Sequence, residues 1–75
     1  MILSSMKKDQ QGVIIELPSD QKNARRLRAL GVRKKANFSV INQQERGIVI
    51  NLNNNLIALD SKVAKAIKVS SPMGN

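Results

Sequence analysis

The chain has 75 residues and a formal net charge of +8, from 13 Lys and Arg residues against 5 Asp and Glu residues. This length suits one small domain with a thin core, because such a chain buries only about 60% of the surface that its unfolded form exposes. The absence of Cys and His excludes a disulfide framework, a thiol nucleophile, a Cys-based zinc site and the usual general base, so we expect a non-enzymatic protein.

The first elements are an apolar N-terminal arm and a strand. Leu3 and Met6 are the anchors of the arm, and an alternating pattern from Gly12 to Leu17 predicts the strand. The residues expected on its buried face are Val13, Ile15 and Leu17.

The next segment changes to a helical period and predicts a helix from about Gln21 to Leu30. Asp20 can cap its first turn, and Gly31 suits the left-handed position that ends many helices. A helix this short is not stable alone, so its apolar stripe must dock on the sheet. The stripe consists of Ala24, Leu27 and Leu30.

Three further strands are expected after the helix. Phe38 and Val40 mark the first, and residues 43–47 form a connection to the second. Ile48, Ile50 and Leu52 mark the second strand and Ile57 and Leu59 the third. Between them, residues 53–55 predict a tight hairpin connection, because Asn tolerates positive φ.

The remaining pattern predicts one helical turn and a last strand. Asp60 or Ser61 can cap a turn that runs to Ala66, and Ile67 and Val69 end the structured part. The sum is a mainly β protein of about five short strands with one inserted helix. Short strands avoid open edges by curling into a small closed barrel, which is the fold we expect.

The chain also indicates where it resides. It has no apolar run near the roughly 20 residues that a spanning helix needs. Its start lacks the basic and apolar regions of a secretory signal. We expect a cytoplasmic single domain over residues 1–75, structured over about 2–69, with a frayed tail over 70–75.

Several segments together resemble a known family. The run RLRALGV at 26–32 is similar to the "RLxxLGI" helix ending of ferrous-iron transport protein A, the FeoA family. Gly12 falls on the strand-opening glycine of that family. The segment IAL at 57–59 resembles its "iaL" strand, and AKAIKV at 64–69 its "A..I.V" ending. The resemblance covers about residues 3–69.

This resemblance implies an SH3-like β-barrel with an inserted helix. It implies a cytoplasmic accessory protein of bacterial ferrous-iron uptake that acts on the membrane permease, ferrous-iron transport protein B. That permease carries a cytoplasmic GTP-hydrolysing domain, and the expected partner is either this domain or the membrane part of the permease. It also implies a family-level association with transition metals. The same module occurs as the C-terminal regulatory domain of metal-dependent repressors. Where the family usually has glycines, this chain has Lys34-Lys35 after the helix and Asp9 before the first strand.

A basic run follows the predicted helix and continues beyond it. Residues 22–35 hold seven positive side chains and no acid. We interpret this run as a docking surface for an acidic partner, because arginine forks pair with carboxylates. A solvated helix face is the alternative. The candidate partner-binding residues are Arg25, Arg26, Arg28, Arg33, Lys34 and Lys35.

Other binding modes are less well supported by the composition. A basic patch on a small barrel is typical of nucleic-acid binding, but single-strand binders stack bases on aromatic side chains, and Phe38 is the one aromatic residue. Weak duplex binding stays open. Proline-rich peptides need an aromatic-lined groove, and the chain has no Trp or Tyr to form one. The remaining modes of peptide binding are strand addition to a sheet edge and a cleft that holds a partner helix.

Metal binding and catalysis are not predicted. The carboxylates are scattered along the chain, and ferrous iron prefers sites with imidazole or several carboxylates. No histidine is present to activate a serine. We therefore predict no cofactor, no catalytic residue and no metal ligand.

Overall fold

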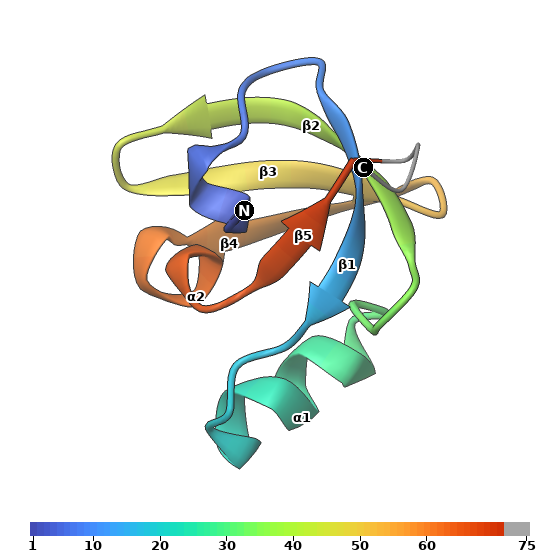
Figure 1. The fold of residues 1–75 in the computed structure, drawn as a ribbon, viewed down its shortest axis with the longest axis vertical. Helices are drawn as coiled ribbons and strands as arrows, with labels where there is room; N and C mark the ends of the chain where they lie inside the picture. Colours follow the sequence, from blue (N-terminus) through green and yellow to red (C-terminus); the bar gives the residue numbers. More distant parts are fainter. Residues whose placement is uncertain (72–75) are drawn as a thin grey trace.

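The computed structural model describes residues 1–71 (Figure 1). In chain order the elements are η1 (Leu3–Ser5), β1 (Gln11–Glu16), α1 (Gln21–Ala29), β2 (Asn37–Gln44), β3 (Gly47–Leu52), β4 (Asn55–Asp60), α2 (Ser61–Lys65) and β5 (Lys68–Ser70). The expected order of a strand, a helix, three strands, a helical turn and a last strand is confirmed.

The strands form one antiparallel sheet in the order β4-β3-β2-β1-β5. Figure 1 shows the sheet curling so that β1 and β5 lie across β3 and β4. This confirms a mainly β, SH3-like fold. The expected closure is wrong, because β4 and β5 are the two ends of the sheet and do not pair with each other.

The N-terminal arm explains why the sheet stays open. Ile2 forms an isolated antiparallel bridge with Lys68, and the Val69 N–H donates to the Met1 carbonyl at 2.8 Å. The arm therefore occupies the edge of β5 that a closed barrel would pair with β4. The helix α2 joins β4 to β5 and contacts η1, β3 and β4 across the open side.

The β3–β4 hairpin is the most regular part of the sheet. Its six residue pairs keep one register from Gly47↔Asp60 to Leu52↔Asn55. Asn53 and Asn54 form the connection with φ of 55° and 67°. Two central residues with positive φ are typical of the type I′ turn, whose twist matches that of the flanking strands. The predicted Asn-based hairpin is confirmed.

The strand β2 is longer than the sequence pattern indicates. Gln43 pairs with Ile48 and Gln44 with Gly47, so the connection shortens to Glu45 and Arg46. The expected connection over 43–47 was too long, because backbone pairing continues past the last apolar residue of the strand.

The buried face of β1 differs from the prediction. Ile14 is fully buried, whereas Ile15 is 46% exposed and Val13 is partly buried. Three consecutive β-branched residues fit either phase of a strand, so periodicity alone did not fix the face. The register shift between Ile14 and Glu16 returns Leu17 to the core, where it packs partly buried as expected.

One apolar cluster fills the interior of the curled sheet. Leu3 and Met6 belong to it, as the sequence predicted. Within residues 1–71 no polar or charged residue is buried. The other buried members of the cluster are Ile14, Leu27, Val32, Phe38, Val40, Ile48, Ile50, Leu52, Ile57, Leu59, Ala64, Ile67 and Val69.

The C-terminal end of the sheet extends slightly beyond the expected limit. Ser70 pairs with Val13, so the ordered part does not stop at residue 69. The rest of the expected frayed tail, residues 72–75, lies outside the described residues. Among the helices described, none has the length and apolar character needed to cross a membrane.

Candidate docking surface

The helix α1 begins at a side-chain cap, as predicted. Asp20 Oδ1 accepts a hydrogen bond from the Lys22 backbone N–H at 3.2 Å, and its Oδ2 accepts one from Asn23 Nδ2 at 2.8 Å. These bonds satisfy a backbone donor that the helix leaves free at its first turn. They also occupy the carboxylate that lies closest in sequence to the basic run.

The end of α1 is a glycine-based cap of the Schellman type. Gly31 has φ of 96°, and its N–H donates to the Arg28 carbonyl at 3.0 Å. The Val32 N–H donates to the Leu27 carbonyl at 2.9 Å, and the Val32 side chain is fully buried. This pairing of bonds with an apolar contact is what defines the motif. It turns the chain sharply, so the residues after Val32 run back along the end of β1.

Few apolar contacts hold α1 on the sheet. Ala24 and Leu27 are buried, but Leu30 is 49% exposed, so the expected three-residue stripe is reduced to two. Leu30 occupies the C-cap position, where the helix ends and its side chain leaves the buried face. Val32 supplies the third anchor instead. The helix is thus attached along one narrow line, and most of its surface faces solvent.

The turn after α1 is fixed to β1 by backbone hydrogen bonds. The Lys35 N–H donates to the Ile14 carbonyl at 2.8 Å, and the Ile14 N–H donates to the Ala36 carbonyl at 2.9 Å. Lys35 has φ of 71° and Asp9 has φ of 72°. Of the Lys34-Lys35 pair, where the resemblance led us to expect glycine, Lys35 has the left-handed conformation, as does Asp9. Lysine is strained there, because its Cβ crowds the backbone.

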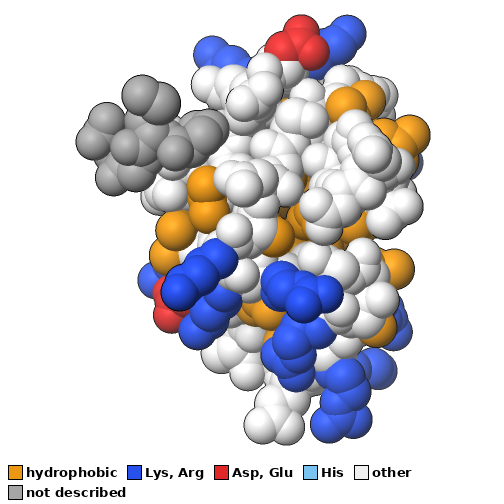
Figure 2. Space-filling view, turned by 90° about the vertical axis from the view of Figure 1, so that its right-hand side faces the viewer, with side chains coloured by type: hydrophobic (Ala, Val, Ile, Leu, Met, Phe, Trp, Pro, Cys, Tyr) orange, Lys and Arg blue, Asp and Glu red, His pale blue; other side chains and the backbone are white. Residues whose placement is uncertain are grey.

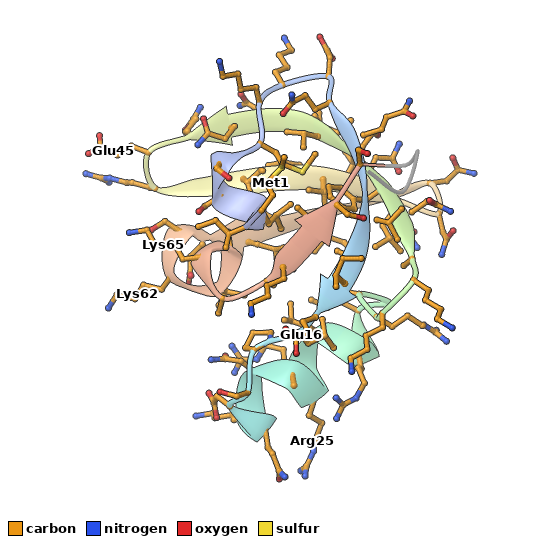
Figure 3. All side chains as sticks on the ribbon, viewed as in Figure 1. Met1, Glu16, Arg25, Glu45, Lys62 and Lys65 are labelled. Atoms are coloured by element: carbon orange, nitrogen blue, oxygen red, sulfur yellow. The ribbon has the colours of Figure 1, made fainter. Side chains whose placement is uncertain are left out.

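The six predicted partner-binding residues are all exposed and come from α1 and the turn that follows it. We call them the cationic surface. Figure 2 shows Lys and Arg side chains gathered on the lower half of one face, the level of α1 in Figure 1. In Figure 3 Arg25 points away from the body of the molecule, below α1. The structure therefore places these residues in one region of the molecule.

Within that region the cationic surface has two flanks on opposite sides of α1. Arg25, Arg28 and Lys34 line a shallow hollow beside the end of β1, and we call them the β1 flank. Arg26 lines a different hollow between α1 and β4, together with the half-exposed Leu30. The helical period explains this separation, since residues 25 and 28 are neighbours on a helix surface and residue 26 is turned away from them.

Within residues 1–71, no acidic side chain forms an ion pair with the cationic surface. Across residues 1–71 the one ion pair joins Lys68 Nζ to Glu16 Oε2 at 3.3 Å. Glu16 also borders the hollow of the β1 flank, so the nearest acid there already has a partner. Asp20 is engaged as the helix cap. Seven positive side chains over residues 22–35 thus repel one another and attract an external anion.

Two of the acidic residues, Asp20 and Asp60, serve as helix caps. Asp60 caps α2 by accepting from the Val63 N–H at 2.8 Å, which settles the choice left open between Asp60 and Ser61. Over the described part of the chain, no three His, Cys, Asp or Glu side chains lie close enough together to hold a metal ion.

Sequence reasoning missed one feature of this region, the exposed apolar residue Leu30 beside Arg26. The pattern assigned Leu30 to the core because it completes a three-residue spacing with Leu27. Its position next to Gly31 was the available signal, since a residue at the helix C-cap is no longer held on the buried face.

Comparison with known proteins identifies the family. A family model described as the FeoA domain matches residues 1–71. The chain belongs to the FeoA family. No curated protein matches the chain. Membership of the FeoA family supports a role in ferrous-iron transport.

Solved structures agree with this fold. The solution NMR structure of FeoA from Chlorobium tepidum is similar with a TM-score of 0.88 and 26% identity, over 100% of this chain and 73% of that one. The crystal structure of an iron uptake regulatory protein, also FeoA, is similar with a TM-score of 0.85 and 20% identity, over 92% of this chain and 93% of that one. A manganese-dependent transcriptional repressor is similar with a TM-score of 0.87 and 19% identity, over 95% of this chain but 41% of that one. The last two likenesses concern the fold alone.

Proposed function

We propose that this protein is a non-enzymatic, cytoplasmic accessory protein of bacterial ferrous-iron uptake that docks on the ferrous-iron permease, ferrous-iron transport protein B. Its membership of the FeoA family supports the pathway. The observation that carries the docking proposal is the cationic surface, whose charges lack partners within residues 1–71. An exposed, unneutralised cluster of arginines fits an acidic partner surface, because guanidinium groups form paired hydrogen bonds with carboxylates.

The proposed mechanism is a shift of the permease between two states. A bound module changes such an equilibrium only by its difference in affinity for the two states. The chain needs no catalytic group for this role, and it contains neither His nor Cys. The narrow attachment of α1 leaves the candidate docking residues exposed outside the apolar cluster, so binding need not disturb the core.

The test is a binding titration against the soluble cytoplasmic domain of the permease, with and without guanine nucleotide. The variant carries Arg26→Glu and Arg28→Glu, one residue from each side of α1. We expect a loss of affinity of at least about tenfold and a weaker dependence on salt, since charge pairs are screened by ions. The matched control carries Lys7→Glu and Lys8→Glu, which changes the net charge equally in the turn before β1, at the opposite end of the molecule (Figure 1). Equal affinities of both variants would exclude the cationic surface as the docking site.

A second candidate is a regulatory domain of the metal-repressor type that acts through protein contacts. The likeness to part of a manganese-dependent transcriptional repressor favours this alternative. A permease gene next to the gene for this chain would favour the first proposal instead.

A nucleic-acid role is tested by titration with duplex DNA at two salt concentrations, since a genuine role requires binding near physiological salt.

A further inference from the structure

The β1 flank has a composition and shape unlike those of a specific pocket. Arg25 and Arg28 on α1 and Lys34 in the following turn border a shallow hollow, and Arg33 and Lys35 extend the same turn. All five side chains are exposed. Within residues 1–71, no side-chain hydrogen bond or ion pair fixes the charged end of any of the five. The positive charge is therefore spread over a surface on long, movable side chains.

The backbone at Lys35 gives a second, independent reason to look for a function here. Its φ of 71° is a conformation that glycine adopts without steric cost and lysine does not. The turn is nevertheless held to β1 by hydrogen bonds on both sides of Ile14. A lysine at this position adds charge at the expense of local stability, which is the pattern expected when the charge is used.

We propose that the β1 flank, with Arg33 and Lys35, binds the anionic phospholipid headgroups of a membrane surface. Spread and movable cations suit a planar layer of negative charge, where each Lys or Arg near the surface raises the binding constant about fivefold. Such a contact needs no fixed side-chain geometry. The inference rests on the proposed function only in that a permease partner places the chain beside a bilayer.

Nucleic acid is the competing anionic surface, and the structure favours it less. Single strands bind through bases stacked on aromatic side chains, and Phe38, the one aromatic residue of the chain, is 4% exposed. Its ring is directed inward and lies against the position where a Cβ of Gly12 would stand. Duplex DNA could still bind by charge alone, so it enters the experiment as a competitor.

The experiment is co-sedimentation with vesicles of phosphatidylcholine, with or without added phosphatidylglycerol, in the absence of any permease. Wild type should sediment with the mixed vesicles only. The variant Arg25→Glu with Lys34→Glu should bind them at least about 25-fold more weakly, from two contributions of about fivefold each. The control, Lys7→Glu with Lys8→Glu, should lose less than about threefold, because charges further apart than the Debye length act weakly on one contact. The molecule measures 28 × 26 × 23 Å, well beyond that length.

Three outcomes would overturn the inference. The first is that wild type does not bind the mixed vesicles near physiological salt. The second is that the Arg25/Lys34 variant and the Lys7/Lys8 control lose equal affinity for them. The third is that duplex DNA displaces the protein completely from the vesicles at a concentration below that of the lipid. Thermal unfolding of both variants shows whether each is folded, and Arg25→Gln with Lys34→Gln provides a milder replacement if the reversed pair unfolds. Failure here leaves the permease titration unaffected, since that experiment contains no lipid.

Discussion

The β3–β4 hairpin and the segment formed by α1 and its following turn are organised in opposite ways. Residues 47–60 contain no Lys or Arg and keep one register throughout. Along β3 buried residues alternate with partly buried ones, and along β4 from Ile57 on they alternate with exposed ones. Residues 21–35 carry seven positive side chains and bury only Ala24, Leu27 and Val32. The hairpin is specified by its packing. The α1 segment is held by a few apolar contacts and exposes its charges to solvent.

The first prediction tests how α1 is attached. Leu27→Ala should lower the free energy of unfolding by about 2–5 kcal/mol, because it removes a fully packed side chain from a thin core. Leu30→Ala should cost less than about 1 kcal/mol, since that side chain is half exposed. Urea denaturation of the two variants measures both values. Similar losses of unfolding free energy in the two variants would mean that Leu30 also packs on the sheet. The α1 segment would then be held by more apolar contacts and would resemble the β3–β4 hairpin more closely.

The second prediction concerns the precision of the hairpin. A Cβ at Gly47 would stand 2.6 Å from the Leu59 carbonyl oxygen, so the backbone of β3 or β4 must shift. Gly47→Ala should therefore cost about 1–3 kcal/mol, the usual range for forced repacking. The control is Ala58→Val on the exposed side of β4, where we expect a change within about 0.5 kcal/mol. Thermal unfolding distinguishes them, and a neutral Gly47→Ala would show that the hairpin is more tolerant than its register indicates.

The third and smallest effect should have the opposite sign. Lys35→Gly should raise the free energy of unfolding by about 0.5–1 kcal/mol, because relief of the left-handed strain exceeds the added entropy of the unfolded chain. Lys34→Gly removes the same charge at a position without positive φ and should not stabilise the protein. The Lys35 variant should also bind anionic vesicles more weakly. Stabilisation by both variants would attribute the gain to reduced charge repulsion rather than to the backbone.

Local sequence signals predicted the elements well where one residue type met one physical requirement. Asp20 and Gly31 bounded α1, and the Asn53-Asn54 turn set the hairpin register. Prediction failed where several residues met the same requirement equally. The run Val13–Ile15 allowed two strand phases, and Leu30 satisfied the helical spacing although the helix ends there.

The sequence by itself determined the order of elements, the unbalanced positive charge and the family, because these depend on residue type and spacing along the chain. Only the tertiary structure decided which face of β1 is buried, that the N-terminal arm pairs with β5 in place of β4, and that the cationic residues divide between two sides of α1. Each of these outcomes depends on contacts between segments far apart in the chain, and no local pattern encodes which distant partner packs best.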